Sequence, residues 1–148
     1  MDKFTIVPSP FFTKGDERSV LSQFVQLKPD DTVSYKELPQ FEAVLVYAGA
    51  MPVVAELLES LLGIEEYNKV VITICNGILS LAVAAGDRLL LANNFEAADF
   101  TTALYYIFAS LSHFQINPEM TTLYFKGELD YEHQEQLFGY FMGVEALS

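Results

Sequence analysis

The chain has 148 residues, of which 51% are hydrophobic and 14% aromatic, so it can bury a core and is not disordered. Its net charge of −12 disfavours binding to nucleic acid or to an anionic membrane surface. The first residues lack the pattern of a signal peptide, and no apolar run is long enough to span a membrane. The single cysteine excludes a disulfide framework, so we expect a cytoplasmic protein.

The last 60 residues carry most of the charge imbalance. After Arg88 the only basic residue is Lys126. The acidic residues of this stretch are Glu96, Asp99, Glu119, Glu128, Asp130, Glu132, Glu135 and Glu145. Such a distribution is typical of a solvated acidic face, and it also suits a docking face for a basic partner.

The first half of the chain predicts strands interleaved with helices. Residues 4–7, 32–35 and 41–47 have the composition of short strands. Asp16 is a suitable cap for a helix, and Pro52 opens a second one. The apolar side of the first helix is expected to hold Val20, Leu21, Phe24 and Val25. That of the second is expected to hold Val54, Leu57, Leu58, Leu61 and Leu62, followed by Gly63 as a C-terminal cap.

Residues 70–95 predict three strands in a meander. They read VVITICNGILSLAVAAGDRLLLANNF, with tight turns at Asn76-Gly77 and Gly86-Asp87. An Asn-Gly pair between apolar runs is a strong signal for a hairpin. Turns this short cannot hold a crossover, so the three strands must be antiparallel.

A long helix follows, with Asp99 as its cap and Asn117-Pro118 at its end. Its apolar face is expected to hold Phe100, Ala103, Leu104, Ile107, Phe108, Leu111 and Phe114. Residues 121–125 then predict a strand, and Asp130 is expected to cap a last helix. The apolar side of that helix is expected to hold Leu137, Phe138 and Phe141.

From about residue 70 the expected order is therefore β-β-β-α-β-α. This order predicts a mixed sheet covered by helices, an α/β (α+β mixed-sheet) fold. It resembles a ribonuclease H-like unit, the half-domain from which actin-like ATPases are built. We expect residues 1–68 to be a remnant of a first lobe and residues 69–148 to be the ribonuclease H-like second lobe, together one compact unit.

Four segments extend the resemblance: FTIVPSPFF, LLLANNF, DFTTALYYIF and INPEMTTLYFKGEL. They resemble an uncharacterised bacterial family, a domain of unknown function with an actin-like ATPase fold. The resemblance implies a two-lobed ancestry and supplies no activity, substrate or catalytic residue. Family members are longer at the front, so the strands at residues 4–7 and 44–46 would lack their usual partners. Bare strand edges associate, so we expect either a shortened chain or pairing with another copy.

In actin-like ATPases the first strand of the meander ends in an acid that holds magnesium, followed by glycines that approach the phosphates. Laid on that pattern, Thr73 occupies the position of the acid. The positions of the glycines and of the following hydroxyl are occupied by Cys75, Asn76, Gly77, Ile78 and Leu79. A glycine pair that contacts adenosine is reduced to Gly127, and Glu128 has the wrong charge. The sequence therefore predicts a degenerate nucleotide site.

Other chemistry finds no support in the sequence. The first-strand acid of a ribonuclease H-type nuclease is absent, and Asp99 and Asp130 fit helix caps better. His113 and His133 are not in a metal-ligand spacing, and Cys75 has no basic neighbour that would activate it. We expect no catalytic residue, no metal site and no cofactor.

The hypothesis that follows is a non-catalytic interaction or scaffold protein whose nucleotide site is degenerate. Its expected partner is another protein or a second copy, not nucleic acid or a membrane. The alternative is a divergent nucleotide-binding ATPase of the same ancestry. A third possibility is a small-ligand site formed by Tyr105, Tyr106 and Tyr124.

Overall fold

A computed structural model describes residues 1–147 and divides the chain into two compact units, Met1–Ala55 and Glu56–Ser148. The division falls at the start of the helix α2 (Val54–Leu61), whereas the sequence placed it after this helix. That the first unit is a remnant of a longer lobe stays a prediction. None of the described helices is long and apolar enough to cross a membrane.

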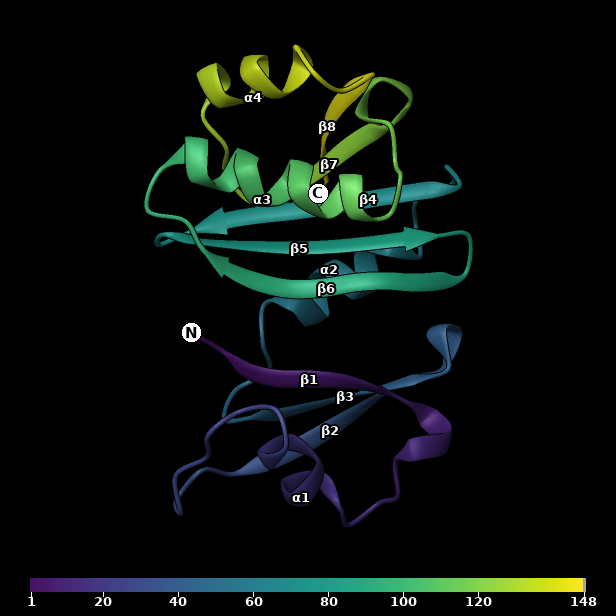
Figure 1. Cartoon of the computed structure of the whole chain (residues 1–148), viewed down its shortest axis with the longest axis vertical. Helices are drawn as coiled ribbons and strands as arrows, with labels where there is room; N and C mark the ends of the chain where they lie inside the picture. The colour runs from purple at the N-terminus through teal and green to yellow at the C-terminus, as the bar shows by residue number, and fades with distance from the viewer. Residues whose placement is uncertain (148) are drawn as a thin grey trace. The chain divides into compact units, whose positions relative to one another are not determined.

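The first unit is a three-stranded antiparallel sheet with one short helix (Figure 1). Its elements are β1 (Lys3–Pro8), α1 (Glu17–Ser22), β2 (Val33–Leu38) and β3 (Ala43–Ala48), with single 3-10 turns at Ser9–Phe11 and Pro39–Phe41. The order is β1-β3-β2, so β3 is paired on both sides. Residues 4–7 and 44–46, whose usual partners were expected to be missing, pair with each other, and β2 pairs with the other side of β3. Within this sheet β1 remains an edge strand.

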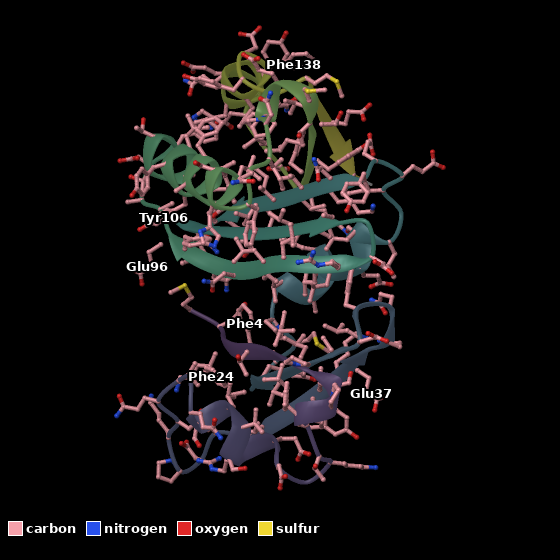
Figure 2. All side chains as sticks on the ribbon, turned by 45° about the vertical axis from the view of Figure 1, so that its right-hand side comes forward. Phe4, Phe24, Glu37, Glu96, Tyr106 and Phe138 are labelled. Atoms are coloured by element: carbon pink, nitrogen blue, oxygen red, sulfur yellow. The ribbon has the colours of Figure 1, made fainter. Side chains whose placement is uncertain are left out.

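The helix α1 is shorter than the sequence predicted. It ends at Ser22, and only Leu21 is fully buried, where it packs against Val44 and Val46. Phe24 was expected on the buried face but is 60% exposed in the segment after the helix (Figure 2). Arg18 holds the loop after α1 in place by donating to the carbonyl oxygens of Asp31 and Lys28, each at 2.7 Å.

The second unit is built on a five-stranded mixed sheet of order β6-β5-β4-β7-β8. Its elements after α2 are β4 (Asn68–Cys75), β5 (Ile78–Ala85), β6 (Arg88–Glu96), α3 (Phe100–His113), a 3-10 turn at Pro118–Met120, β7 (Thr122–Lys126), α4 (Tyr131–Phe138) and β8 (Gly143–Leu147). The strands β4, β5 and β6 are antiparallel, whereas β7 runs parallel to both β4 and β8. The predicted element order and mixed sheet are confirmed, and the structure adds β8.

Both predicted turns of the meander are present. Asn76 and Gly77 adopt φ values of 51° and 74°, the left-handed pair that a two-residue hairpin turn requires. Gly86, in the second turn, has a φ of 60°. The first turn fixes the register of β4 and β5, in which Cys75 pairs with Ile78, and the second fixes that of β5 and β6, in which Ala85 pairs with Arg88.

The core of the second unit lies between the sheet and α3, which crosses one face of it (Figure 1). The helix buries Ala103, Ile107 and Leu111 completely, at the spacing of four residues that keeps them on one face. The strands contribute alternate residues to this core: Val70 and Ile72 from β4, Leu79, Leu81 and Val83 from β5, and Leu123 and Phe125 from β7. The predicted amphipathic helix is confirmed.

Three predicted apolar or capping positions are wrong at the ends of helices. Phe138 is 57% exposed on the outer side of α4 (Figure 2), whereas Leu137 and Phe141 are buried. Leu62 is 56% exposed because α2 already ends at Leu61. Gly63 does not adopt the left-handed conformation, since the chain leaves α2 through a 3-10-type bond from its N–H to the Ser60 carbonyl.

The two predicted aspartate caps behave differently. The Asp99 carboxylate accepts a hydrogen bond from the Thr102 N–H at 2.7 Å, as a capping residue should. Asp130 also stands at an N-cap position, but its side chain makes no capping bond and lies 3.7 Å from Nδ1 of His133. The prediction is confirmed for Asp99 and wrong for the Asp130 side chain.

This difference gives a matched test. The hydrogen bond from the Thr102 N–H holds the pKa of Asp99 below its ordinary value. A carboxyl with a depressed folded pKa stabilises the fold above its unfolded pKa and loses that effect as the pH falls through the folded pKa. We expect Asp99→Ala to lower the melting temperature clearly at pH 7 and progressively less as the pH falls below the ordinary pKa of aspartate. Asp130→Ala should have a smaller effect at pH 7, and an equal loss in both variants would contradict the assignment.

Candidate functional site

The candidate site is the carboxyl end of the parallel strands β4 and β7. Their register pairs Ile72 with Phe125, which places the next residues, Thr73 and Lys126, side by side. In open α/β sheets, ligands bind at the carboxyl ends of parallel strands. The structure therefore brings together the two elements that the sequence singled out separately, because a Cβ added to Gly127 would lie 3.6 Å from Thr73 Oγ1.

A hydrogen bond from a side chain to the main chain joins the carboxyl ends of β4 and β7. Thr73 Oγ1 donates to the carbonyl oxygen of Lys126 at 3.0 Å, and both residues are half-buried. A carboxylate in place of Thr73 would have no proton to donate and would face the carbonyl oxygen instead. The local geometry thus favours a hydroxyl at the position where a nucleotide site needs an acid.

Gly77 and Gly127 are needed at the site because the backbone turns there require positive φ. A Cβ on Gly77 would meet no atom within 4 Å, so its need for glycine comes from its φ of 74°. Its carbonyl accepts from the Ala97 N–H at 2.8 Å, which joins the hairpin to the chain after β6. Gly127 has a φ of 79° and ends β7 in the same way. Cys75, the last residue of β4 before the Asn76-Gly77 turn, is exposed.

A row of polar side chains crosses the sheet from Thr73, and the sequence analysis missed it. Cross-strand pairing sets Thr73 opposite Ser80 and Ser80 opposite Asn94. Ser80 is 2% exposed and donates to Asn94 Oδ1 at 2.7 Å. Lys126 extends the row onto β7. The available signal was the Asn93-Asn94 pair inside an apolar strand, since buried polar groups need partners.

This row lies on the sheet face opposite α3, because residues alternate between faces along a strand and Ile72, Leu79 and Leu81 face α3. It contains one cation, Lys126, together with hydroxyl and amide groups that hydrogen-bond within the protein. No group of three His, Cys, Asp or Glu side chains suited to a metal occurs within residues 1–147. The row is therefore a set of mutually bonded polar groups that contains no carboxylate.

Of the three tyrosines proposed as a ligand platform, Tyr105 and Tyr106 meet edge to face with ring centres 5.4 Å apart, whereas Tyr124 lies on the other face of the sheet. The Tyr124 hydroxyl donates to Glu66 Oε1 at 2.6 Å on the sheet face opposite α3. Burial, followed by the Glu66 hydrogen bond and charge, raises the pKa of Tyr124 well above its ordinary value. Tyr106 instead stacks on Phe95 with ring centres 4.6 Å apart, and Tyr105 is 67% exposed. The hypothesis of a shared tyrosine site is wrong.

Both histidines pack against aromatic rings. His133 stacks on Phe100 at 4.0 Å with the ring planes within 4° of parallel. His113 occupies the last turn of α3 and meets Phe114 edge to face at 4.8 Å. Neither residue contributes to the carboxyl end of β4 and β7.

Two solved structures share this fold. One is a Bacteroides thetaiotaomicron protein with an actin-like ATPase fold and unknown function, with a TM-score of 0.79 and 17% identity over 99% of this chain. The other is the PilM–PilN type IV pilus biogenesis complex, with a TM-score of 0.56 and 14% identity over 100% of this chain. The chain covers 65% and 66% of these two proteins, so it spans about two thirds of their length. At these identities the likeness shows the fold alone.

A search of curated proteins gave no significant match. The profile of a family described as "Protein of unknown function (DUF3822)" matches residues 1–63 and 48–141. These two matches cover most of the chain, including the meander, α3 and β7. The chain therefore belongs to the DUF3822 family, and its fold is that of the actin-like ATPases.

Proposed function

We propose that this protein is a non-catalytic interaction or scaffold module whose actin-like nucleotide site is degenerate. The observation that carries the proposal is the hydrogen bond from Thr73 Oγ1 to the Lys126 carbonyl. Thr73 stands at the position of the magnesium-binding acid, and its hydroxyl proton is already donated to the Lys126 carbonyl. The bacterial cytoplasm is the compartment we propose, consistent with the single free cysteine.

The electrostatics of the site support the absence of nucleotide chemistry. Magnesium bound to nucleotide prefers carboxylate and water oxygens, and phosphate binding needs several convergent N–H donors or cations. Lys126 supplies one cation at this end of the sheet, and Glu128 follows it two residues later with the opposite charge. The left-handed φ values of Asn76 and Gly77 are explained by the hairpin turn itself and need no role in phosphate binding.

A partner protein is the second part of the proposal. PilM, one of the proteins that share the fold, is seen in a complex with PilN, so this fold can serve protein assembly. The second unit exposes several large apolar side chains, which is typical of a surface that binds another protein.

Nucleotide binding is tested by thermal melting with 5 mM ATP and 10 mM magnesium. A ligand at 100 times its Kd would stabilise the native state by about 2.7 kcal/mol, which shifts the melting temperature by several degrees. We expect no shift beyond that given by the same concentration of magnesium with sulfate as a non-nucleotide anion control. A shift of several degrees would exclude the degenerate site.

The alternative of a divergent nucleotide-binding ATPase is favoured by one observation, the half-buried Lys126 at the carboxyl end of β7. If ATP binds there, Lys126→Ala should abolish the thermal shift while leaving the melting temperature without ligand nearly unchanged. Lys69→Ala, on the neighbouring strand β4, is the control for removing a lysine. A shift that Lys126→Ala removes and Lys69→Ala retains would establish the alternative.

A further inference from the structure

An apolar groove lies on the second unit, formed by the end of α3, the Pro118–Met120 turn and the connection from α4 to β8. It consists of two open hollows of about 430 Å³ each that share Phe108, Asn117 and Pro118. The first hollow is completed by Glu119, Gly139 and Tyr140, and the second by Leu111, Ser112, Gln115 and Ile116. We call this surface the Phe108 groove.

The walls of the groove are fixed by contacts within the fold. The rings of Phe108 and Tyr140 meet edge to face at 4.9 Å. The Met142 N–H donates to the carbonyl oxygens of Pro118 and Thr121 at 3.1 and 3.0 Å, which ties the α4–β8 connection to the 3-10 turn. A groove held in this way is preorganised, so binding would not require the chain to order itself first.

Large apolar side chains stay exposed at this end of the unit. Tyr140 is 53% exposed, Met142 57% and Met120 75%, although they neighbour a core with fully buried residues. Tyrosine and methionine are enriched in the buried centres of interfaces, and methionine adapts its shape to a partner. An apolar surface of this kind indicates a binding site for a protein segment.

The charge around the groove specifies the partner. None of the lining residues is basic, and Glu119 stands on the rim. Ser112 and Gln115, at and just beyond the end of α3, line the second hollow with neutral polar side chains. The strand β7 begins beside the groove and carries Lys126 at its other end. A second copy of this acidic chain would be repelled, whereas a cationic segment would be attracted.

We propose that the Phe108 groove binds a basic amphipathic helix of a partner protein. The apolar ridge of the helix would fill the two hollows, and its flanking lysine or arginine residues would face Glu119. A helix fits better than an added strand, because the groove is lined by side chains and not by the open edge of the sheet. This inference names the partner surface of the proposed scaffold and rests on that proposed function.

The test uses the whole chain and a panel of fluorescent 15-residue peptides composed of lysine and either leucine, phenylalanine or methionine at helical spacing. Fluorescence anisotropy should show saturable binding of at least one peptide with a Kd below about 100 µM. Peptides of the same composition without an apolar face, and peptides with glutamate in place of lysine, should bind at least about tenfold more weakly.

Matched variants locate the binding. Tyr140→Ala should weaken the best peptide by about tenfold or more, because aromatic anchors dominate such interfaces. E119K should weaken it by about threefold through the lost attraction. Tyr131→Ala and E128K, which alter exposed residues outside the groove, should leave the affinity unchanged.

Three results would overturn the proposal. One is the absence of binding by every helical peptide, and another is an equal loss in Tyr140→Ala and Tyr131→Ala. The third is a dimer of the chain, measured by light scattering, that Tyr140→Ala dissociates, because a second copy would then occupy the groove. None of these depends on ATP, so the groove and the degenerate nucleotide site can fail separately.

Discussion

Replacing Ile107 with alanine is expected to lower the free energy of unfolding of the second unit by about 3 kcal/mol, within the range measured for buried isoleucine to alanine changes. Ile107 is 0% exposed and lies between Ala103 and Leu111 on the buried face of α3. Across from it stand the alternating apolar residues of β4 and β5. The helix cannot move inward to fill the space, since the strands are held by pairing on both sides.

The measurement is urea unfolding followed by far-ultraviolet circular dichroism, in which α3 contributes as the longest described helix. Tyr105→Ala is the control, because Tyr105 is on the same helix and 67% exposed. Surface substitutions of this kind usually change stability by less than about 0.5 kcal/mol. Equal effects of the two variants would mean that α3 does not bury the face described here.

Phe141→Ala is expected to have an equal or larger effect, a loss of about 3–5 kcal/mol. Phe141 is 4% exposed, and its ring stacks near that of Phe108 with centres 5.8 Å apart. It joins the α4–β8 connection to α3, so its removal opens a cavity where three elements meet. The free energy of unfolding and its dependence on urea give the measurement, as for Ile107→Ala.

Phe138→Ala is the matched control for Phe141→Ala. The sequence placed both phenylalanines on the apolar side of the last helix, whereas the structure exposes 57% of Phe138. We expect Phe138→Ala to change stability by less than about 0.5 kcal/mol. If Phe138→Ala were the more damaging variant, the placement of α4 would be incorrect.

The sequence specified the elements whose signals are local. The Asn76-Gly77 turn requires left-handed backbone at both positions, and few residue pairs other than Asn-Gly provide it. The face of α3 repeats at three and four residues over 14 residues, which leaves little ambiguity about its buried side. These features, with the mixed order of strands and helices, were enough for the actin-like fold.

The elements that escaped prediction depend on distant partners. The strand β8 has five residues that include Gly143 and the charged Glu145, and it becomes a strand because it pairs in parallel with β7. The strand β3 has no local sign of its position in the sheet, yet β1 and β2 both pair with it. Phe24 and Leu62 show that the last turn of a predicted helix is the least certain, since a helix that ends early releases its final apolar residue.

The candidate site was predictable only in its parts. Thr73 and Gly127 could each be laid on the pattern of actin-like ATPases, and the parallel register of β4 and β7 brings them together. The hydrogen bond from Thr73 to Lys126 could not be foreseen, because the acceptor is a main-chain carbonyl 53 residues away. The same holds for Ser80 and Asn94, whose hydrogen bond follows from the cross-strand register.

The claim that the nucleotide site is degenerate is tested most directly by nuclear magnetic resonance of the ¹⁵N-labelled chain titrated with ATP and magnesium. The amide signals of Thr73, Gly77 and Gly127 report on the carboxyl ends of β4 and β7 and on the hairpin turn between β4 and β5. We expect these signals not to move between zero and 5 mM ATP, relative to the same titration with magnesium alone. Saturable shifts of these three amides that Lys126→Ala abolishes would contradict the account and identify a working nucleotide site.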